Sequence, residues 1–204
     1  MIQSRPYLIG LTGGIASGKT NITRALIKQG AQVIDADEIS RSLTADGGKA
    51  LLLIRESFGE AIFEGTSLNR KHLGEIVFAD TVLRGKLNNI MHPLIYTEIE
   101  EQIQQHRQET ALIIDVPLLF EAGWHSLCDE VWCTYAPVRT QVHRLRRRDG
   151  LSLHQAIRRI KSQMPGLEQC RRSDHCIVTT GTRKQSAEKA LAIWRDALRR
   201  ANFA

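Results

Sequence analysis

The stretch from Gly13 to Thr20 has the residue types and the spacing of a phosphate-binding loop. Gly13 and Gly18 bracket four residues, and Lys19 and Thr20 follow directly. Glycine lets the backbone turn with its N–H groups pointing inward, and the amides that begin a following helix carry partial positive charge. Lysine can reach phosphate oxygens as a mobile charge, while a threonine hydroxyl can ligate Mg²⁺. The complete pattern therefore predicts a polyphosphate site rather than a glycine-rich turn that binds nothing. The expected phosphate-binding residues are Gly14, Ile15, Ala16, Ser17, Gly18, Lys19, Thr20 and Asn21.

Carboxylates end two apolar runs that are typical of buried strands. Asp35 and Asp37 end the run 32–37, and Asp115 lies near the end of the run 111–117. In an open parallel sheet the carboxyl ends of the strands form the ligand crevice, so these acids are expected beside the phosphate loop. Asp115 could there hold a water in the Mg²⁺ shell. Asp37 is favoured for a functional role, whereas for Asp35 a functional role and capping of the next helix are equally acceptable. If the segment stays extended, both side chains point to the same side of the strand.

The hydrophobic pattern predicts the elements that must position these residues. An apolar, extended run at 7–12 precedes the phosphate loop, and a helical pattern follows it. Further strands are expected at 130–135 and 176–179, and a final helix runs through Leu198. Continuous apolar runs of this kind are typical of strands that are buried in a parallel sheet. The pattern favours an α/β fold.

The segment 46–105 has a different pattern and is interpreted as an insertion. Helical segments joined by turns replace the buried strands there. His92-Pro93 is expected to interrupt the third of these helices, so that Pro93 begins a fourth. Helices inserted beside a phosphate loop commonly supply the substrate site, although an inert appendage would fit the pattern as well. A histidine beside proline is usually structural.

Positive charge is concentrated in the segment 143–172, which is interpreted as a lid. Arg144 and Arg148 lie one turn apart if this part is helical, so their guanidinium groups could converge on one anion. The formal net charge of +6 suits either nucleic acid or a polyanionic small molecule. A surface that stacks nucleic-acid bases requires aromatic residues among its cationic ones, and none are interleaved with these arginines. A lid that closes over transferring phosphates fits better, although some of these arginines belong to a solvated face.

Length and composition limit the remaining possibilities. The 204 residues, of which 42% are hydrophobic, are enough for one globular domain with insertions. No apolar run has the length of a membrane span and no cleavable leader is recognisable, so a cytoplasmic protein without a membrane partner is expected. The four cysteines form no CxxC pair and are expected to be reduced thiols. They are Cys128, Cys133, Cys170 and Cys176.

Several motifs in one order resemble the dephospho-coenzyme A kinase family, from about residue 7 to about residue 200. They are Thr12 to Thr20, Asp35-Ala36-Asp37 with Arg41, His92-Pro93-Leu94-Ile95, Asp115 to Glu121, Arg144 to Asp149, and Gln163-Met164-Pro165. The resemblance implies the last step of coenzyme A biosynthesis, in which ATP phosphorylates the ribose 3′-hydroxyl of dephospho-coenzyme A. It also implies one P-loop NTPase domain over 1–204, with a three-layer core around a parallel sheet, a helical substrate insertion and a lid. Neither nucleic acid nor an obligate protein partner is expected.

The resemblance implies roles for individual residues in phosphoryl transfer. Lys19 and the loop amides hold the ATP phosphates, Thr20 ligates Mg²⁺, and Asp115 lies in the outer shell of the metal. Asp37 accepts the hydrogen bond of the attacking hydroxyl. Arg144 and Arg148, in the lid, are candidates that neutralise the charge of the transferring phosphates. Arg41 and His92 are candidates that contact the substrate.

Three places depart from the family pattern. Ala16 stands where another glycine is usual, and a methyl group can occupy that position if the local φ is negative. Thr179-Thr180 replace a common asparagine, and Gln169 replaces a common lysine. These departures concern how the base side of the nucleotide is held and not the reaction.

Two alternatives stay open. The nearer one is a kinase of the same fold that phosphorylates another nucleoside, nucleotide or small metabolite. The farther one is a nucleotide-switched module that binds nucleic acid, which the basic charge suggests and the scarcity of aromatic residues, 5% of the chain, disfavours.

Overall fold

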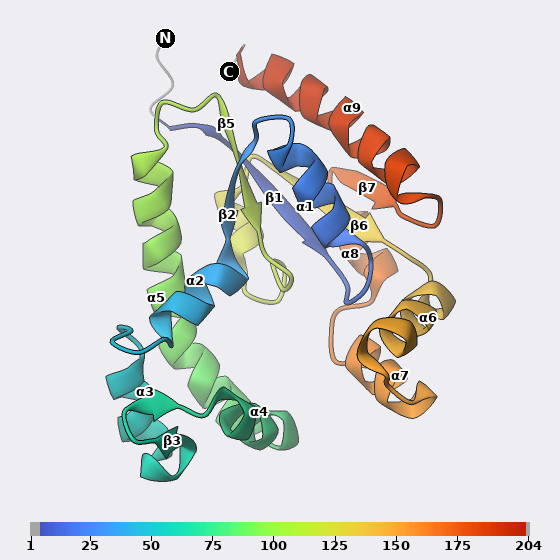
Figure 1. Cartoon of the computed structure of the whole chain (residues 1–204). Coiled ribbons are helices and arrows are strands. Elements are labelled where there is room, and N and C mark those ends of the chain that lie inside the picture. Colours follow the sequence, from blue (N-terminus) through green and yellow to red (C-terminus); the bar gives the residue numbers. More distant parts are fainter. Residues whose placement is uncertain (1–4, 203–204) are drawn as a thin grey trace. The chain divides into compact units, whose positions relative to one another are not determined.

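Residues 5–202 are described by the structure, a computed structural model (Figure 1). The chain divides into two compact units. The core unit comprises the chain up to Ile34 and from His106 onward, and the helical unit is Asp35–Gln105. Within residues 5–202, no helix combines the length and the apolar character that a membrane span requires.

A five-stranded sheet forms the centre of the core unit, in the order β2-β5-β1-β6-β7. The central strand β1 pairs in parallel with β5 and β6, and β6 pairs in parallel with β7. β1 and β5 are buried almost throughout instead of alternating, as expected for strands that are covered on both faces. The strands are β1 (Tyr7–Gly13), β2 (Gln32–Asp35), β5 (Ala111–Asp115), β6 (Glu130–Tyr135) and β7 (His175–Val178).

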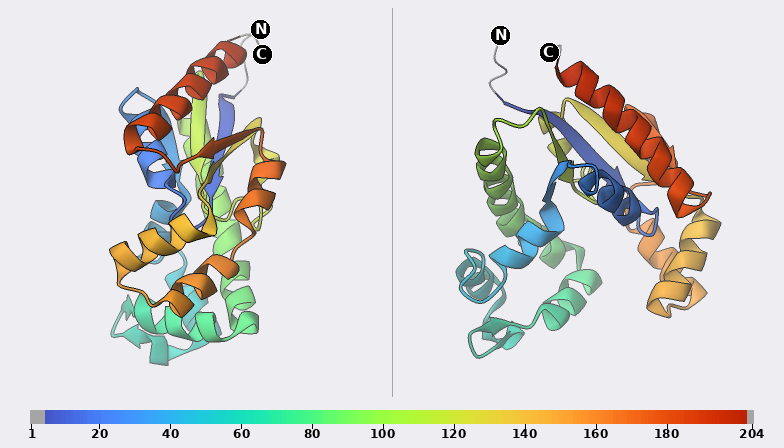
Figure 2. Two further views of the ribbon diagram at one scale, coloured as in Figure 1. Left: turned by 90° about the vertical axis from the view of Figure 1, so that its right-hand side faces the viewer. Right: turned by 45° about the horizontal axis from the view of Figure 1, so that its top comes forward.

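Helices cover both faces of this sheet. Figure 2 shows α1 (Lys19–Ile27) and α9 (Arg183–Ala201) on one face and α8 (Gly166–Arg172) on the other. The three-layer α/β fold with a parallel sheet, expected from the sequence, is thereby confirmed. The connection from β5 to β6 also contains a short 3₁₀ helix, η2 (Trp124–Leu127).

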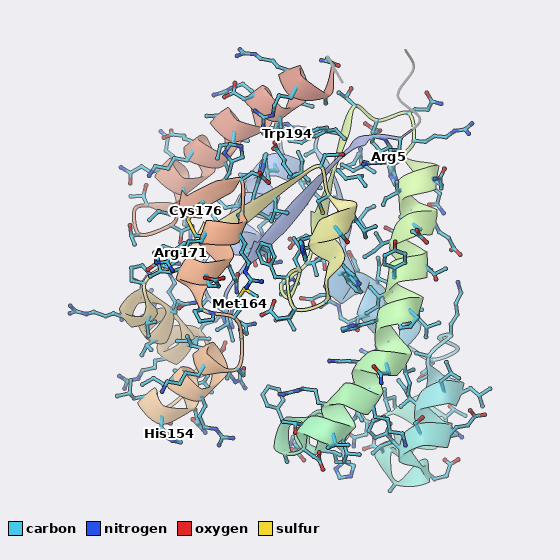
Figure 3. All side chains as sticks on the ribbon, turned by 180° about the vertical axis from the view of Figure 1, so that it is seen from behind. Arg5, His154, Met164, Arg171, Cys176 and Trp194 are labelled. Atoms are coloured by element: carbon cyan, nitrogen blue, oxygen red, sulfur yellow. A yellow bond between two sulfur atoms is a disulfide. The ribbon has the colours of Figure 1, made fainter. Side chains whose placement is uncertain are left out.

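The main apolar cluster of the core unit fixes α1 to the sheet. Trp132 on β6 is fully buried and meets Trp194 of α9 edge to face, with ring centroids 6.5 Å apart (Figure 3). Ile22 and Leu26 of α1 are completely buried in the same cluster. Burial stabilises each such aliphatic side chain by about 1.5–3 kcal/mol. The start of α1, and with it the end of the predicted phosphate loop, is therefore held in a fixed position on the sheet.

Two helices lie between β6 and α8 in the sequence, and they include most of the segment 143–172 that was predicted to be a lid. α6 (Val138–Asp149) ends at Gly150, whose φ of +67° is a left-handed conformation that glycine adopts without strain. α7 (Leu153–Lys161) begins with a capping box in which Ser152 and Gln155 bind each other's backbone amides. The break and the restart are both encoded locally, so the segment forms two separate helices.

A disulfide joins Cys170, in the last turn of α8, to Cys176 on β7 (Figure 3). The expectation that all four cysteines are reduced is therefore wrong for this pair. The spacing of six residues matches no framework pattern, but the chain turns back between α8 and β7 and brings the two side chains together. Cys128 and Cys133 are free, and burial raises the pKa of each thiol to about 12.

The helical unit has a core of its own. α2 packs against α5, and α3 and α4 also contact α5. Completely or nearly completely buried side chains, such as Ile54 and Ile99, fill the space between the helices. The elements are α2 (Ala36–Leu43), α3 (Leu51–Phe58), η1 (Glu60–Ile62), a small hairpin of β3 (Phe63–Glu64) and β4 (Ser67–Leu68), α4 (Arg70–Ala79) and α5 (Thr81–Gln105).

Pro93 does not end a helix, contrary to the expectation from the sequence. α5 is one helix of 25 residues that contains Pro93, and its axis bends partway along (Figure 1). Proline removes one backbone hydrogen bond and crowds the preceding turn, which kinks a helix when tertiary packing keeps both halves helical. Met91 and Ile95, on either side of Pro93, are both buried and supply that packing.

Candidate active site

The phosphate loop, residues 13–20, connects the end of β1 to the start of α1. Gly13 is required by close approach, because a Cβ there would lie 2.1 Å from Thr134 Oγ1. Gly18, the N-cap of α1, has a φ of +102°. Within residues 5–202, the amides of Gly18, Lys19 and Thr20 have no hydrogen-bond acceptor. Converging, unpaired amides at a helix N-terminus attract an anion such as phosphate.

Lys19, which was expected to hold phosphates, forms an ion pair with Asp115, which was expected to lie in the outer shell of Mg²⁺. Its ammonium donates to Asp115 Oδ1, and Thr23 Oγ1 donates to Asp115 Oδ2 at 2.6 Å. Asp115 ends β5 and is only 3% exposed, so the pair is largely shielded from water. Thr23 was missed from the sequence, although it lies one helical turn after Lys19 and therefore on the same face of α1.

The methyl group of Ala16 was expected to be tolerated if the local φ were negative. The φ of Ala16 is +57°, so that condition is not met. Ala16 is the one non-glycine residue with positive φ among residues 5–202. A left-handed conformation costs an alanine roughly 1–2 kcal/mol, because its Cβ approaches a carbonyl oxygen. The loop keeps this conformation only if surrounding contacts hold it.

The two lid arginines have different surroundings. Arg144 Nη1 donates to the carbonyl of Ala16 at 3.0 Å, and Arg144 Nη2 donates to the carbonyl of Thr179 at 2.5 Å. Burial, and then repulsion from Arg183, lower the pKa of Arg144. Arg148 instead binds Asp149 through two hydrogen bonds of 2.7 and 2.9 Å. Arg144 therefore lies at the phosphate loop, whereas in the described residues Arg148 has no hydrogen bond to it.

Two glutamines, one on α6 and one after α7, also contact the phosphate loop, although neither was assigned a role from the sequence. Gln141 Nε2 donates to the carbonyl of Ile15 at 2.8 Å, and Gln163 Oε1 accepts from the Ile15 amide at 2.7 Å. Gln163 belongs to the Gln163-Met164-Pro165 motif, which was the available signal. No sequence signal pointed to Gln141, because a glutamine on a helix is usually solvated.

The predicted acceptor-side residues lie in the helical unit. Asp35 caps α2 by accepting from the amides of Asp37 and Glu38, so α2 begins before Asp37 and the expectation of an extended Asp35–Asp37 segment is wrong. Asp37 is exposed in the first turn of α2, and Arg41 lies one turn later. The carbonyl of Arg41 accepts from Arg70 at 2.9 Å.

A pocket of about 170 Å³ lies within the helical unit, close to Arg41 in the chain. Apolar side chains of α4 and α5, and polar side chains of α2 and the start of α4, are among the residues that line it. His92, the remaining candidate, is half-buried on α5, and burial lowers its pKa. The pocket is lined by Ser40, Thr44, Leu68, Arg70, Leu73, Gly74, Val77, Leu87 and Met91.

The side chains that were predicted to hold Mg²⁺ are of a suitable chemical type. Thr20 carries an exposed hydroxyl in the first turn of α1, and Asp115 carries a carboxylate at the end of β5. Mg²⁺ is usually bound by one or two protein oxygens together with substrate phosphates and water, not by a complete protein cage. Among residues 5–202 no cluster of three or more His, Cys, Asp or Glu side chains that could hold a metal ion occurs.

Comparisons with known proteins agree on one family. The model of the dephospho-CoA kinase family matches residues 7–185. A dephospho-CoA kinase of Symbiobacterium thermophilum is 42% identical over 193 residues, which cover 93% of this chain and 81% of the relative. A dephospho-CoA kinase of Staphylococcus aureus is 40% identical over 191 residues, covering 91% and 92% of the two chains.

Solved structures support the same fold. TT1252 from Thermus thermophilus is similar with a TM-score of 0.82 and 29% identity, covering 94% of this chain and 98% of the other. Dephospho-CoA kinase from Campylobacter jejuni has a TM-score of 0.70 and 28% identity, covering 94% and 97%. A shikimate kinase from Acinetobacter baumannii, 17% identical with a TM-score of 0.58 and covering 97% and 96%, shares the fold alone.

Proposed function

Because this chain belongs to the dephospho-CoA kinase family, we propose that it transfers the γ-phosphate of ATP to the 3′-hydroxyl of dephospho-coenzyme A, giving coenzyme A and ADP. The observation that carries the proposal is the family match over residues 7–185, a span that includes the phosphate loop with its unpaired amides. An alcohol acceptor and a nucleotide donor require a protein that aligns two ligands and neutralises charge.

The phosphate loop would hold the ATP phosphates. Its free amides at Gly18, Lys19 and Thr20 supply hydrogen bonds, and the Lys19 ammonium exchanges Asp115 for phosphate oxygens. Thr20 directly, and Asp115 through water, would hold Mg²⁺, which supplies additional positive charge next to the phosphates when it is bound. The remaining members of the segment Gly14–Asn21 shape the loop around the anion.

The helical unit, with the predicted insertion at about 46–105, would hold the acceptor. Asp37 accepts the hydrogen bond of the attacking 3′-hydroxyl and takes its proton as the O–P bond forms. Arg41 and His92 contact the rest of dephospho-coenzyme A, and the pocket beside Arg70 supports binding of an acceptor in this unit. The lid, at about 143–172, brings Arg144 and Arg148 to the transferring phosphoryl group.

An assay with single omissions tests this proposal. Purified protein is mixed with Mg-ATP and dephospho-coenzyme A, each component is omitted in turn, and ADP and the acceptor mass are followed. We expect acceptor-dependent ADP and a product heavier by one phosphoryl group, with ³¹P NMR locating the new phosphate at the ribose 3′ position. ADP formation that depended on a nucleoside or another metabolite, and not on dephospho-coenzyme A, would keep the fold and reject the acceptor.

A further inference from the structure

The three peptide groups around Ala16 are each bound by a side chain from α6 or from the segment that follows α7. The amide of Ile15 donates to Gln163 Oε1 at 2.7 Å, and the carbonyl of Ile15 accepts from Gln141 Nε2 at 2.8 Å. The carbonyl of Ala16 accepts from Arg144 Nη1 at 3.0 Å. The two peptide planes that flank the Ala16 Cα are therefore fixed. The preceding plane, between Gly14 and Ile15, is fixed as well.

This arrangement acts on the strained residue of the phosphate loop. The φ and ψ angles of Ala16 are the rotations between the two peptide planes that Gln141 and Arg144 hold. A residue in a sparsely populated region keeps its conformation only when its surroundings determine it. Gly14 leaves room for one of these side chains, because a Cβ at that position would lie only 3.0 Å from Gln141 Nε2.

The segment that carries Gln163 is itself held in place. The amide of Met164 donates to Glu121 Oε1 at 2.9 Å, and the carbonyl of Met164 accepts from Gln169 Nε2 at 3.0 Å (Figure 3). Gln169 is buried, with 1% of its surface exposed. The side chain of Gln163 thus reaches the phosphate loop from a backbone that Glu121 and Gln169 hold at the next residue, Met164.

We propose that Gln141, Arg144 and Gln163 form a clamp that keeps Ala16 at positive φ and so holds the phosphate loop in its anion-binding shape before nucleotide arrives. Gln163 is then a positioning residue, since it acts through the backbone of Ile15. The clamp couples the lid to nucleotide affinity, because preorganisation of the loop lowers the cost of binding. The inference rests on the proposed function only in taking a nucleotide as the ligand of the loop.

Gln163→Ala, alone and combined with Ala16→Gly, tests the clamp by calorimetric titration with Mg-ADP. The single variant should raise the Kd of Mg-ADP by about fivefold to tenfold, the scale of one hydrogen bond. Glycine adopts positive φ without strain, so Ala16→Gly/Gln163→Ala should return the Kd to within about twofold of the wild-type value. In turnover assays, Gln163→Ala should raise the KM for ATP and leave the KM for dephospho-coenzyme A unchanged.

Controls separate the clamp from a general loss of structure. Gln104→Ala removes an exposed glutamine from α5 and should leave the Kd unchanged. Glu121→Ala should raise the Kd less than Gln163→Ala and add nothing in the Gln163→Ala background, because it acts through the same segment.

Two outcomes would overturn the clamp. An unchanged or lower Kd in Gln163→Ala would mean that Gln163 does not hold the loop or competes with phosphate for the Ile15 amide. A double variant as weak as Gln163→Ala would mean that strain at Ala16 is not what Gln163 opposes. The titration needs no acceptor, so an error in the proposed acceptor would appear in the omission assay and not here.

Discussion

Asp35 and Asp37 are two positions apart, and their surroundings separate their roles. The Asp35 carboxylate accepts hydrogen bonds from two backbone amides and closes the start of α2. Asp37 lies in the first helical turn and is exposed. A carboxylate that closes the start of a helix in this way has a structural role there. The neighbouring Asp37 is therefore the better candidate for the base.

Asp37→Asn should lower kcat by roughly 10²-fold or more, the scale of a lost general base, while the Kd of Mg-ATP stays unchanged. Steady-state kinetics and a nucleotide titration provide the two numbers. Asp35→Asn is the matched control, because asparagine caps a helix as well as aspartate does, and kcat should be nearly retained. Equal losses of kcat in the two variants would assign the effect to the start of α2 and remove Asp37 from the base role.

The Lys19–Asp115 pair predicts a separation between stability and activity. Lys19→Met should lower kcat/KM for ATP by about 10²-fold or more and also lower the Tm without ligand, because the buried Asp115 carboxylate loses its partner. Lys19→Met/Asp115→Asn should recover much of the Tm and none of the activity. Thermal melts and initial rates measure both. A double variant no more stable than Lys19→Met would show that the unpaired Asp115 carboxylate is not what lowers the Tm of the single variant.

The elements of the core unit were predictable from the sequence where the signal is local. β6 (Glu130–Tyr135) contains the apolar run Val131-Trp132-Cys133 directly after two acidic residues, and the phosphate loop follows directly from its glycine spacing. α5 was missed because packing of Met91 and Ile95 overrides the local effect of Pro93. The contact of Gln163 with Ile15 joins positions 148 residues apart, and no local pattern encodes such a contact.

The disulfide between α8 and β7 predicts a response to reductant. Closing a loop over a separation of six residues is expected to contribute about 2 kcal/mol to the free energy of unfolding, if the effect arises from the restricted entropy of the unfolded chain. Cys176→Ser should therefore lower the urea midpoint of the oxidised protein. Dithiothreitol should lower the wild-type midpoint to the same value and leave Cys176→Ser unchanged. A wild-type midpoint that did not respond to dithiothreitol would restore the sequence-based expectation of reduced thiols.

Across the whole molecule, the candidate residues divide between the two units. The phosphate loop, Asp115 and the lid belong to the core unit, whereas Asp37 and Arg41 belong to the helical unit. Each unit has its own buried core, so each can respond to its own ligand through local stability. The motifs and charges from which the members of both groups were predicted are local features of the sequence. Their division was less predictable, because the compact helical unit starts at Asp35, the last residue of β2, where the hydrophobic pattern shows no break.

Hydrogen exchange of the complete chain tests this division. Mg-ADP alone should slow amide exchange mainly in the core unit, at 13–28 and in the lid, because a bound phosphate accepts hydrogen bonds from loop amides that are otherwise unpaired. Dephospho-coenzyme A alone should slow exchange mainly within 35–105. Coenzyme A, which carries the 3′-phosphate, serves as the control for a ligand of nearly the same size. If dephospho-coenzyme A protected only the core unit, the helical unit would lose its assignment as the acceptor site, and Asp37 would lose the main reason for its role as the base.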